Sequence, residues 1–215
     1  MSARLAILIS GRGSNMEAIL NACRAADYPA EPVLVLSDRA DAAGLDTARA
    51  GGVAAEHIVH TGPKDRAAFE AALTARLKAA QIDLICLAGF MRMLSAAFVE
   101  EWRDLIVNIH PSLLPSFKGL DTHRQALEAG VKLHGCTVHY VRAGMDDGPI
   151  IGQAAVPVLP DDTEDALAMR VLSAEHRLYP ACIRLVVEGR APVRSNVAAL
   201  EMAVPAAVPI FMPPA

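Results

Sequence analysis

The chain has 215 residues, of which 53% are hydrophobic and 20% charged, a composition typical of a globular protein and not of a disordered one. Basic side chains number 20 and acidic ones 24, and the formal net charge of −4 argues against a nucleic-acid or membrane-surface footprint. The length fits one large domain with a single core.

The first half of the chain alternates short apolar runs with amphipathic, Ala-rich segments. This alternation is typical of parallel strands joined by crossover helices. We predict strands over Leu5–Ile9, Pro32–Ser37, Ala54–Val59, Leu84–Ala88 and Ile106–His110. The helices between them are predicted over Asn15–Ala25, Gly44–Ala50 and Asp65–Ala80.

The pattern changes after the fifth strand. A short helix is predicted first, then two strands that a turn could join as an antiparallel pair, then a long helix. These elements are predicted over Thr122–Ala129, Gly135–Val141, Ile150–Pro157 and Thr163–Glu188. Pro180 is expected to kink the last helix, because proline lacks the N–H of the helical hydrogen bond. The fold class predicted is α/β, a Rossmann-like three-layer fold with a mostly parallel central sheet and an antiparallel C-terminal portion.

The domain organisation follows from composition. We predict one domain over residues 1–190, followed by a loosely packed, Pro- and Ala-rich tail over residues 191–215. The four cysteines form no Cys-x-x-Cys pair, so neither a zinc site nor a disulfide framework is indicated. No signal peptide or membrane span is recognisable, and we expect a cytoplasmic protein.

The segment after the fifth strand carries the strongest chemical signal. Asn108 and His110 are two residues apart in a predicted strand and therefore share one face. Asparagine can donate to a developing oxyanion, and histidine can transfer a proton near neutral pH. Taken alone, the pair is more simply a turn-capping amide and a structural histidine at a strand end, so the context decides.

A glycine-rich turn joins the first strand to the first helix, with the sequence Ser-Gly-Arg-Gly-Ser-Asn over residues 10–15. Free amides and the helix dipole favour a phosphate at such a turn. A dinucleotide fingerprint would place a third glycine at Met16, and a P-loop would need Gly-Lys-Ser/Thr, so both patterns fail. A purely structural tight turn remains the alternative.

Two further segments could complete a site. Asp146 and Asp147 lie in a turn-like acidic segment that is most simply exposed, but one of their carboxylates would orient the imidazole of His110 if the turn folded back. The Met- and Leu-rich segment after the fourth strand could be helix core, yet Gly89 and apolar side chains at the carboxyl end of a strand also suit a pocket for a flat heterocycle.

The order of these segments resembles the folate-dependent formyltransferases. The motifs are Ser-Gly-x-Gly-Ser-Asn from Ser10, Ala-Gly-Phe-Met-Arg from Ala88, Asn-Ile-His-Pro-Ser-Leu-Leu-Pro from Asn108, Thr-His-Arg-Gln-Ala-Leu from Thr122, and Asp-x-Gly-Pro from Asp146. The resemblance runs from about Leu5 to Tyr179. Within the family, the chain is most similar to the enzymes that formylate glycinamide ribonucleotide in purine synthesis.

The resemblance implies transfer of the formyl group of 10-formyltetrahydrofolate to the amine of glycinamide ribonucleotide, through a tetrahedral intermediate and without a metal. The catalytic residues that it implies are Asn108, His110 and Asp146. It places the ribonucleotide at Gly13, Ser14, Asn15 and Glu175. It places the folate at Arg66, Met91, Arg92, Met93, Leu94, Arg142 and Asp146. Asp147 departs from the family pattern, because small residues are usual at its position.

Other functions compete with this one. Methionyl-tRNA formyltransferase shares the central motif but carries a further C-terminal domain and a basic surface for tRNA, neither of which is expected here. Formyltetrahydrofolate deformylase uses water as the acceptor and usually bears an N-terminal regulatory domain, which we do not expect here. A non-catalytic nucleotide-binding module on the same scaffold is the third alternative. We expect small-molecule substrates, no nucleic acid, no membrane, and a monomer or homodimer.

Overall fold

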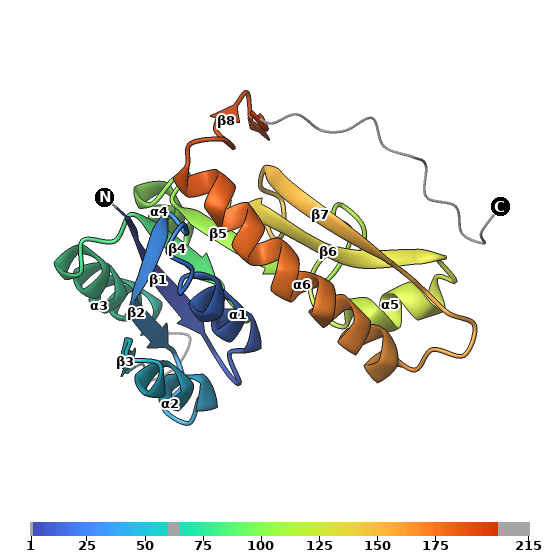
Figure 1. The fold of residues 1–215 in the computed structure, drawn as a ribbon, viewed down its shortest axis with the longest axis horizontal. Coiled ribbons are helices and arrows are strands. Elements are labelled where there is room, and N and C mark those ends of the chain that lie inside the picture. Colours follow the sequence, from blue (N-terminus) through green and yellow to red (C-terminus); the bar gives the residue numbers. More distant parts are fainter. Residues whose placement is uncertain (1, 60–64, 202–215) are drawn as a thin grey trace.

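The computed structural model describes residues 2–59 and 65–201. Its main sheet has seven strands in the order β3-β2-β1-β4-β5-β6-β7 (Figure 1). The first five strands run parallel, and β6 and β7 are antiparallel to their neighbours. The strands are β1 (Ala3–Ile9), β2 (Ala30–Ser37), β3 (Ala54–His57), β4 (Leu84–Leu87), β5 (Ile106–His110), β6 (Leu133–Tyr140) and β7 (Ile150–Pro157).

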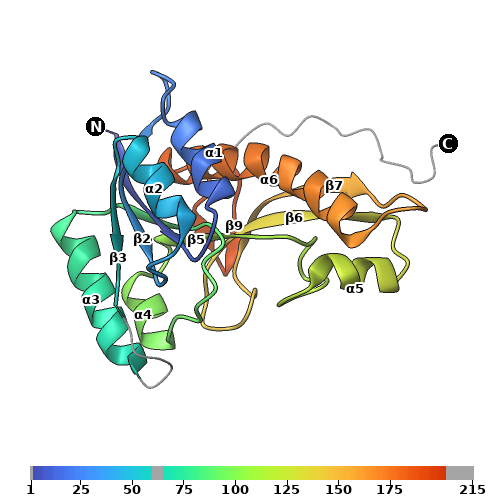
Figure 2. The same ribbon diagram turned by 90° about the horizontal axis from the view of Figure 1, so that it is seen from below.

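Helices cover both faces of this sheet. They are α1 (Ser14–Ala22), α2 (Ala43–Ala50), α3 (Arg66–Ala79), α4 (Ala96–Glu101), α5 (Thr122–Glu128) and α6 (Glu164–Val187). Figure 2 shows α1, α2 and α6 on one side of the sheet and α3 and α4 on the other. The predicted three-layer α/β fold, with its antiparallel C-terminal strands, is confirmed.

The central strand β1 explains why the sheet is covered on both sides. Leu5, Ile7 and Ile9 belong to the core beneath α1 and α6, whereas Ala6 and Leu8 belong to the core beneath α3 and α4. All five side chains are fully buried. A strand whose two faces are both apolar needs a helical layer on each side, since successive side chains point in opposite directions.

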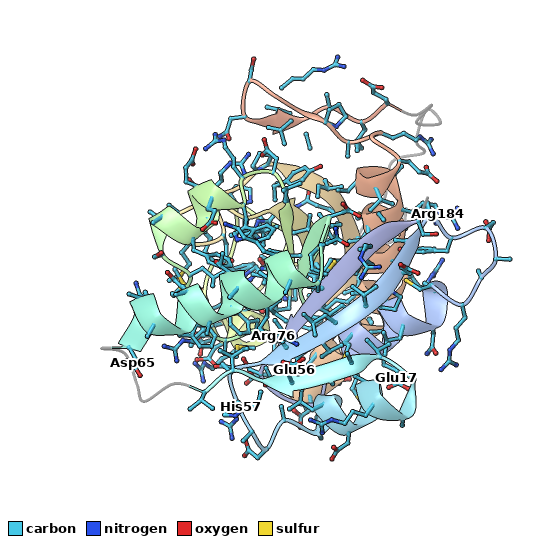
Figure 3. All side chains as sticks on the ribbon, turned by 90° about the vertical axis from the view of Figure 1, so that its left-hand side faces the viewer. Glu17, Glu56, His57, Asp65, Arg76 and Arg184 are labelled. Carbon is cyan, nitrogen blue, oxygen red and sulfur yellow. The ribbon has the colours of Figure 1, made fainter. Side chains whose placement is uncertain are left out.

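The edge strand β3 is tied to the helix layer by charge. Figure 3 shows Arg76 of α3 reaching towards Glu56 of β3. The Arg76 Nε donates a hydrogen bond of 2.8 Å to the Glu56 Oε2. A charged pair at this position covers an edge that would otherwise be open to another strand.

The chain order places a topological switch point beside β1. After β1 the chain moves outward to β2 and β3, and then returns to place β4 on the other side of β1. In open α/β sheets, ligands bind at the carboxyl ends of the strands where the order reverses. Here the loops after β1 and β4 meet at that edge, where the Ser10 N–H donates to the Gly89 carbonyl at 3.1 Å.

One local feature differs from the sequence-based expectations. The short helix α4 was not predicted; Ser95 caps it by accepting a 3.1 Å hydrogen bond from the Phe98 N–H. The long predicted helix is present as α6, which continues through the buried Pro180. The Pro180 carbonyl accepts a hydrogen bond of 2.8 Å from the Tyr28 hydroxyl, so this part of α6 is held against the body.

The segment predicted as a loose tail begins with ordered structure. It forms a small hairpin of β8 (Val193–Arg194) and β9 (Val197–Ala198), and β9 lies next to β7. Ala191 is 1% exposed, and its carbonyl accepts a hydrogen bond from the Tyr140 hydroxyl. The predicted domain boundary at residue 190 therefore does not mark the end of packed structure, and the rest of the predicted tail, residues 202–215, lies outside the described residues.

One buried hydroxyl joins α6 to the centre of the sheet. Tyr179 is fully buried, and its hydroxyl contacts the carbonyls of Leu87 at 2.9 Å and Val107 at 3.1 Å. These carbonyls belong to the ends of β4 and to β5, next to the predicted catalytic residue Asn108.

Replacing this tyrosine should destabilise the fold measurably. We expect Tyr179→Phe to lower the free energy of unfolding by about 1–3 kcal/mol, because two buried carbonyls lose a donor while the ring stays in place. Urea unfolding followed by circular dichroism measures this change. An unchanged midpoint would contradict the proposed link between helix and sheet.

Candidate active site

The end of β5 lies in a cleft of about 510 Å³. Asn108 and His110 both line this cleft, as their two-residue spacing predicted. His110 is only 5% exposed, so its ring is held by the protein and not by water. Antiparallel pairing places His139 of β6 directly opposite Asn108.

Asp146 reaches the same place from the loop between β6 and β7. Its Oδ2 lies 3.5 Å from the His110 Nδ1 and accepts a 2.9 Å hydrogen bond from the Gly119 N–H. Two positions in the loop have a constrained backbone. Asp146 has a positive φ of 47°. Residue 148 must be glycine, because a Cβ there would lie 1.7 Å from the Tyr140 carbonyl oxygen. The structure therefore brings Asn108, His110 and Asp146 together.

The hydrogen bonds assign a tautomer to His110. Its Nε2 lies 3.0 Å from the Phe117 carbonyl oxygen, which can only accept, so Nε2 carries a proton. The other ring nitrogen, Nδ1, faces the Asp146 carboxylate at ion-pair distance. The arrangement suits movement of a proton along the carboxylate–imidazole pair.

Asp147, the departure from the family pattern, has a partner in this chain. Its Oδ1 lies 2.6 Å from the Lys118 Nζ, and this hydrogen bond lowers the pKa of the Asp147 carboxyl. Together with the Gly119–Asp146 hydrogen bond, the ion pair joins the loop after β5 to the loop after β6.

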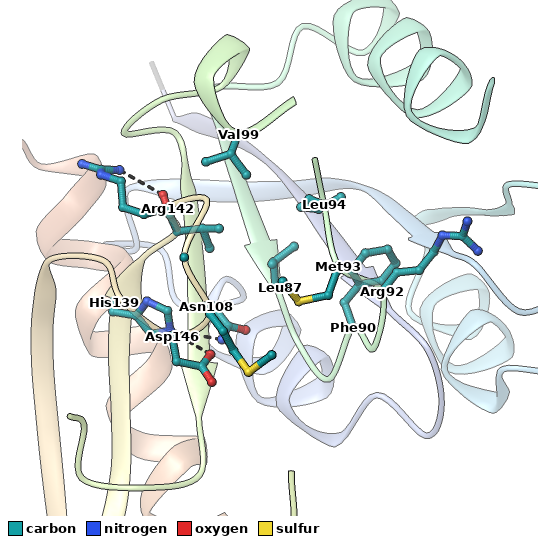
Figure 4. A pocket seen from close by; sticks show the side chains of 13 residues that line it. Leu87, Phe90, Arg92, Met93, Leu94, Val99, Asn108, His139, Arg142 and Asp146 are labelled. Atoms are coloured by element: carbon teal, nitrogen blue, oxygen red, sulfur yellow. Dashed lines mark hydrogen bonds and ion pairs between the residues drawn. The ribbon is translucent and has the colours of Figure 1, made fainter. Parts of the chain in front are cut away.

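A smaller hollow of about 110 Å³ opens beside the cleft (Figure 4). Its walls are apolar side chains from β4, the segment after it, and α4: Leu87, Phe90, Met93, Leu94 and Val99. Its polar lining consists of Asn108, His139, Arg142 and Asp146, with Arg92 at the rim in Figure 4. An apolar slot with a few converging polar groups fits a flat heterocycle.

Most of the residues that the resemblance assigned to the folate lie at this hollow or at the cleft. Arg92, Met93, Leu94, Arg142 and Asp146 line the hollow, and Met91 lines the cleft. Arg66 is the exception. It is the first residue of α3, is exposed, and is not among the residues that line either space.

The glycine-rich turn forms a second recess of about 230 Å³, at the switch point between β1 and β4. Gly13, Ser14 and Asn15 line it. Gly13 precedes α1 with a φ of 76°, and no side chain caps the helix. The first-turn amides of α1 are thus oriented as an anion site requires.

Glu175 does not line this recess but lies behind it. The Asn15 Nδ2 donates a 2.6 Å hydrogen bond to the Glu175 Oε2 from α1 to α6. Burial raises the pKa of the Glu175 carboxyl, and the hydrogen bond from Asn15 offsets only part of that increase. The Asn15 Oδ1 is buried and has no hydrogen-bond partner among the described residues, so the pair offers an unused acceptor beside the recess.

His139 was not predicted from the sequence. It is 2% exposed, its Nε2 lies 3.2 Å from the Asn108 Nδ2, and the same atom lies 4.0 Å from the Asp146 Oδ1. The sequence shows His139 only as a histidine within a predicted strand, with no motif that marks it as functional. Its place opposite Asn108 depends on the pairing register of β5 and β6, which no local spacing reveals.

Within residues 2–59 and 65–201, no three His, Cys, Asp or Glu side chains gather so that they could hold a metal ion. None of the helices in that part of the chain combines the length and hydropathy of a membrane span.

A family description of formyl transferases matches residues 3–183. The chain belongs to the formyl transferase family. Among its relatives, it is 43% identical over 197 residues to phosphoribosylglycinamide formyltransferase of Escherichia coli, a match that covers 92% of this chain and 93% of that enzyme. The crystal structure of glycinamide ribonucleotide transformylase 1 from Symbiobacterium toebii superposes with a TM-score of 0.87 at 50% identity, over 93% of this chain and 94% of that one.

A longer formyl transferase relative is also similar. The chain is 51% identical over 196 residues to the trifunctional purine biosynthetic protein adenosine-3 of Drosophila melanogaster. That match covers 90% of this chain but only 14% of the fly protein, so this formyl transferase chain spans a small part of that relative's length.

The buried carboxyl of Glu175 predicts a pH-dependent stability. The folded chain holds the Glu175 proton more tightly than the unfolded chain does, so this group's contribution to stability is lost as the pH rises from 4.5 through the raised folded pKa. We expect Glu175→Gln to be more stable than the wild type at pH 8 and to match it at a pH below 4.5, by urea unfolding. Glu128→Gln, on exposed α5 surface, is the matched control and should change neither. Lower stability of Glu175→Gln at pH 8 would contradict the desolvation argument.

The Lys118–Asp147 ion pair predicts charge-dependent activity. Because the pair is exposed, its loss should raise the KM for 10-formyltetrahydrofolate, the donor that the resemblance implies, by only about twofold to fivefold, as expected for a weak surface pair. We expect the single variants Asp147→Ala and Lys118→Asp to show this increase in KM. The double variant that exchanges the charges, Lys118→Asp with Asp147→Lys, should return KM most of the way to the wild-type value. Steady-state kinetics at low and high salt measures the effect, which salt should weaken. Additive losses in the swapped variant would show that the pair does not hold the loops.

Proposed function

We propose that this protein transfers the formyl group of 10-formyltetrahydrofolate to the amine of glycinamide ribonucleotide in purine biosynthesis. The observation that carries the proposal is the meeting of Asn108, His110 and Asp146 in one cleft, which adjoins an apolar hollow and the recess at the glycine-rich turn. Membership of the formyl transferase family and the similarity to the E. coli enzyme support the same reaction.

Asn108 and His110 can both donate a hydrogen bond to the formyl oxygen of the substrate. The formyl oxygen gains charge when the amine attacks the formyl carbon, and an N–H of Asn108 that is not used by His139 is free to stabilise it. One well-placed donor of this kind is typically worth about 3 kcal/mol of transition-state stabilisation. The Nε2–H of His110 can serve the same oxygen once the Phe117 carbonyl is replaced as its acceptor.

Asp146 completes this set from the other side of the imidazole. Its carboxylate faces the His110 Nδ1 and thereby orients the ring for proton transfer in the transition state. The attacking amine loses one proton and the leaving folate nitrogen gains one, so the site needs only to move a proton between them. Holding both substrates in attack geometry supplies much of the remaining rate enhancement.

The two ends of the cleft account for the two substrates. The first-turn amides at Gly13, Ser14 and Asn15 suit the ribonucleotide phosphate, and Glu175 holds Asn15 in place. The pterin ring suits the apolar hollow beside Met93 and Leu94. The remaining folate contacts of our proposal are Arg66, Met91, Arg92, Arg142 and Asp146.

The cellular setting that we propose follows from composition. The formal net charge of −4 argues against a nucleic-acid partner, and we propose small-molecule substrates only. We further propose that the protein acts in the cytoplasm as a monomer or a homodimer.

The decisive experiment compares acceptors. We expect the protein to deplete 10-formyltetrahydrofolate, followed by folate absorbance, only when glycinamide ribonucleotide is added. In the same assay His110→Ala should lower kcat by about a hundredfold to ten-thousandfold with little change in either KM, because it removes a general acid–base. Steady loss of the formyl group without an acceptor would instead identify a deformylase, and no reaction under either condition would favour a binding module. Wild-type turnover in His110→Ala would refute the catalytic assignment.

A further inference from the structure

His139 is a buried histidine whose two ring nitrogens are both engaged. Its Nδ1 lies 2.9 Å from the Tyr140 carbonyl oxygen. Because a carbonyl oxygen can only accept, this contact assigns the ring proton to Nδ1. In the neutral ring Nε2 is then a hydrogen-bond acceptor.

That acceptor meets Asn108. The Asn108 Nδ2 lies 3.2 Å from the His139 Nε2, and an amide nitrogen can only donate. The reverse orientation of the Asn108 carboxamide would place two acceptors, its Oδ1 and the imidazole lone pair, against each other in a buried site. His139 therefore decides which end of the carboxamide faces β6, and a carboxamide has one further N–H to offer elsewhere.

We propose that His139 is a positioning residue for formyl transfer, which orients the Asn108 carboxamide so that its second N–H serves the substrate oxygen. This role rests on the proposed function, because it assigns to Asn108 the oxyanion contact of that reaction. Asn108 lines both the cleft and the hollow, so its free N–H lies where the two substrate spaces join.

The charge around His139 shows why a neutral ring is needed. Burial lowers the pKa of His139, and the Asp146 carboxylate 4.0 Å away only partly opposes this effect, while His110 and Lys118 reinforce it. A proton on Nε2 would replace the acceptor with a donor and turn the Asn108 amide around. It would also attract Asp146 away from His110, since the carboxylate lies between the two rings.

The test uses two substitutions of the same residue. Leucine removes the acceptor, whereas the Oε1 of glutamine can take the position of the imidazole Nε2. We expect His139→Leu to lower kcat by about tenfold to a hundredfold, a fall no larger than that caused by removing an oxyanion donor. Both KM values should stay within about twofold of the wild type. We expect His139→Gln to recover kcat to within about threefold of the wild type. Equal impairment of the two variants, or wild-type kcat in His139→Leu, would overturn the proposal.

A double-mutant cycle separates positioning from general disruption. If His139 acts through Asn108, then His139→Leu should cause no further loss of kcat in an Asn108→Ala background. Independent, multiplicative losses would show that His139 acts by another route. The wild type is assayed first: if it transfers no formyl group to glycinamide ribonucleotide, the proposed function fails, whatever the His139 variants do.

A spectroscopic measurement on the wild type needs neither activity nor a folded variant. Nitrogen-15 NMR of the histidine rings should show His139 neutral at pH 7, protonated at Nδ1 and bare at Nε2. A ring protonated at Nε2, alone or together with Nδ1, would contradict the orientation of Asn108 and overturn the proposal.

Discussion

The antiparallel pairing of β6 with β5 is the constraint on which the site depends. The five strands before it run parallel and bring only their carboxyl ends to one edge of the sheet. The reversal at β6 places His139 opposite Asn108, and the following loop carries Asp146 back to His110. One change of strand direction thus assembles polar groups from three separate segments around a single point.

The parallel half of the sheet forms the recess that we propose as the anion site. The loops after β1 and β4 meet because the strand order reverses there, and α1 begins at that edge without a side-chain cap. The apolar hollow lies on the other side of the same edge and is walled by residues of β4, the segment after it, and α4. A charged ligand and a flat apolar one can therefore approach the end of β5 from two directions.

Much of this arrangement could be predicted from local sequence. The apolar runs of β1, β4 and β5 predict buried parallel strands, and the spacing of Asn108 and His110 places both on one face. What local patterns could not reveal were contacts between distant segments. The position of His139 depends on the register between β5 and β6. The burial of Glu175 depends on the packing of α1 against α6, and the partner of Asp147 comes from a separate loop.

Two elements were also missed. The hairpin of β8 and β9 was missed because its Pro- and Ala-rich sequence shows no strand periodicity. The helix α4 was missed because six residues are too few to show a helical periodicity.

The hydrogen bonds of the Tyr179 hydroxyl help to set the distance between the two substrate spaces. Tyr179 and Glu175 lie one turn apart on α6, so the bond that anchors the helix to the Leu87 and Val107 carbonyls also sets the distance from Glu175 to the end of β5. Glu175 in turn contacts Asn15 at the glycine-rich turn. The docking of α6 against the sheet thus links the position of the glycine-rich turn to that of His110 at the end of β5.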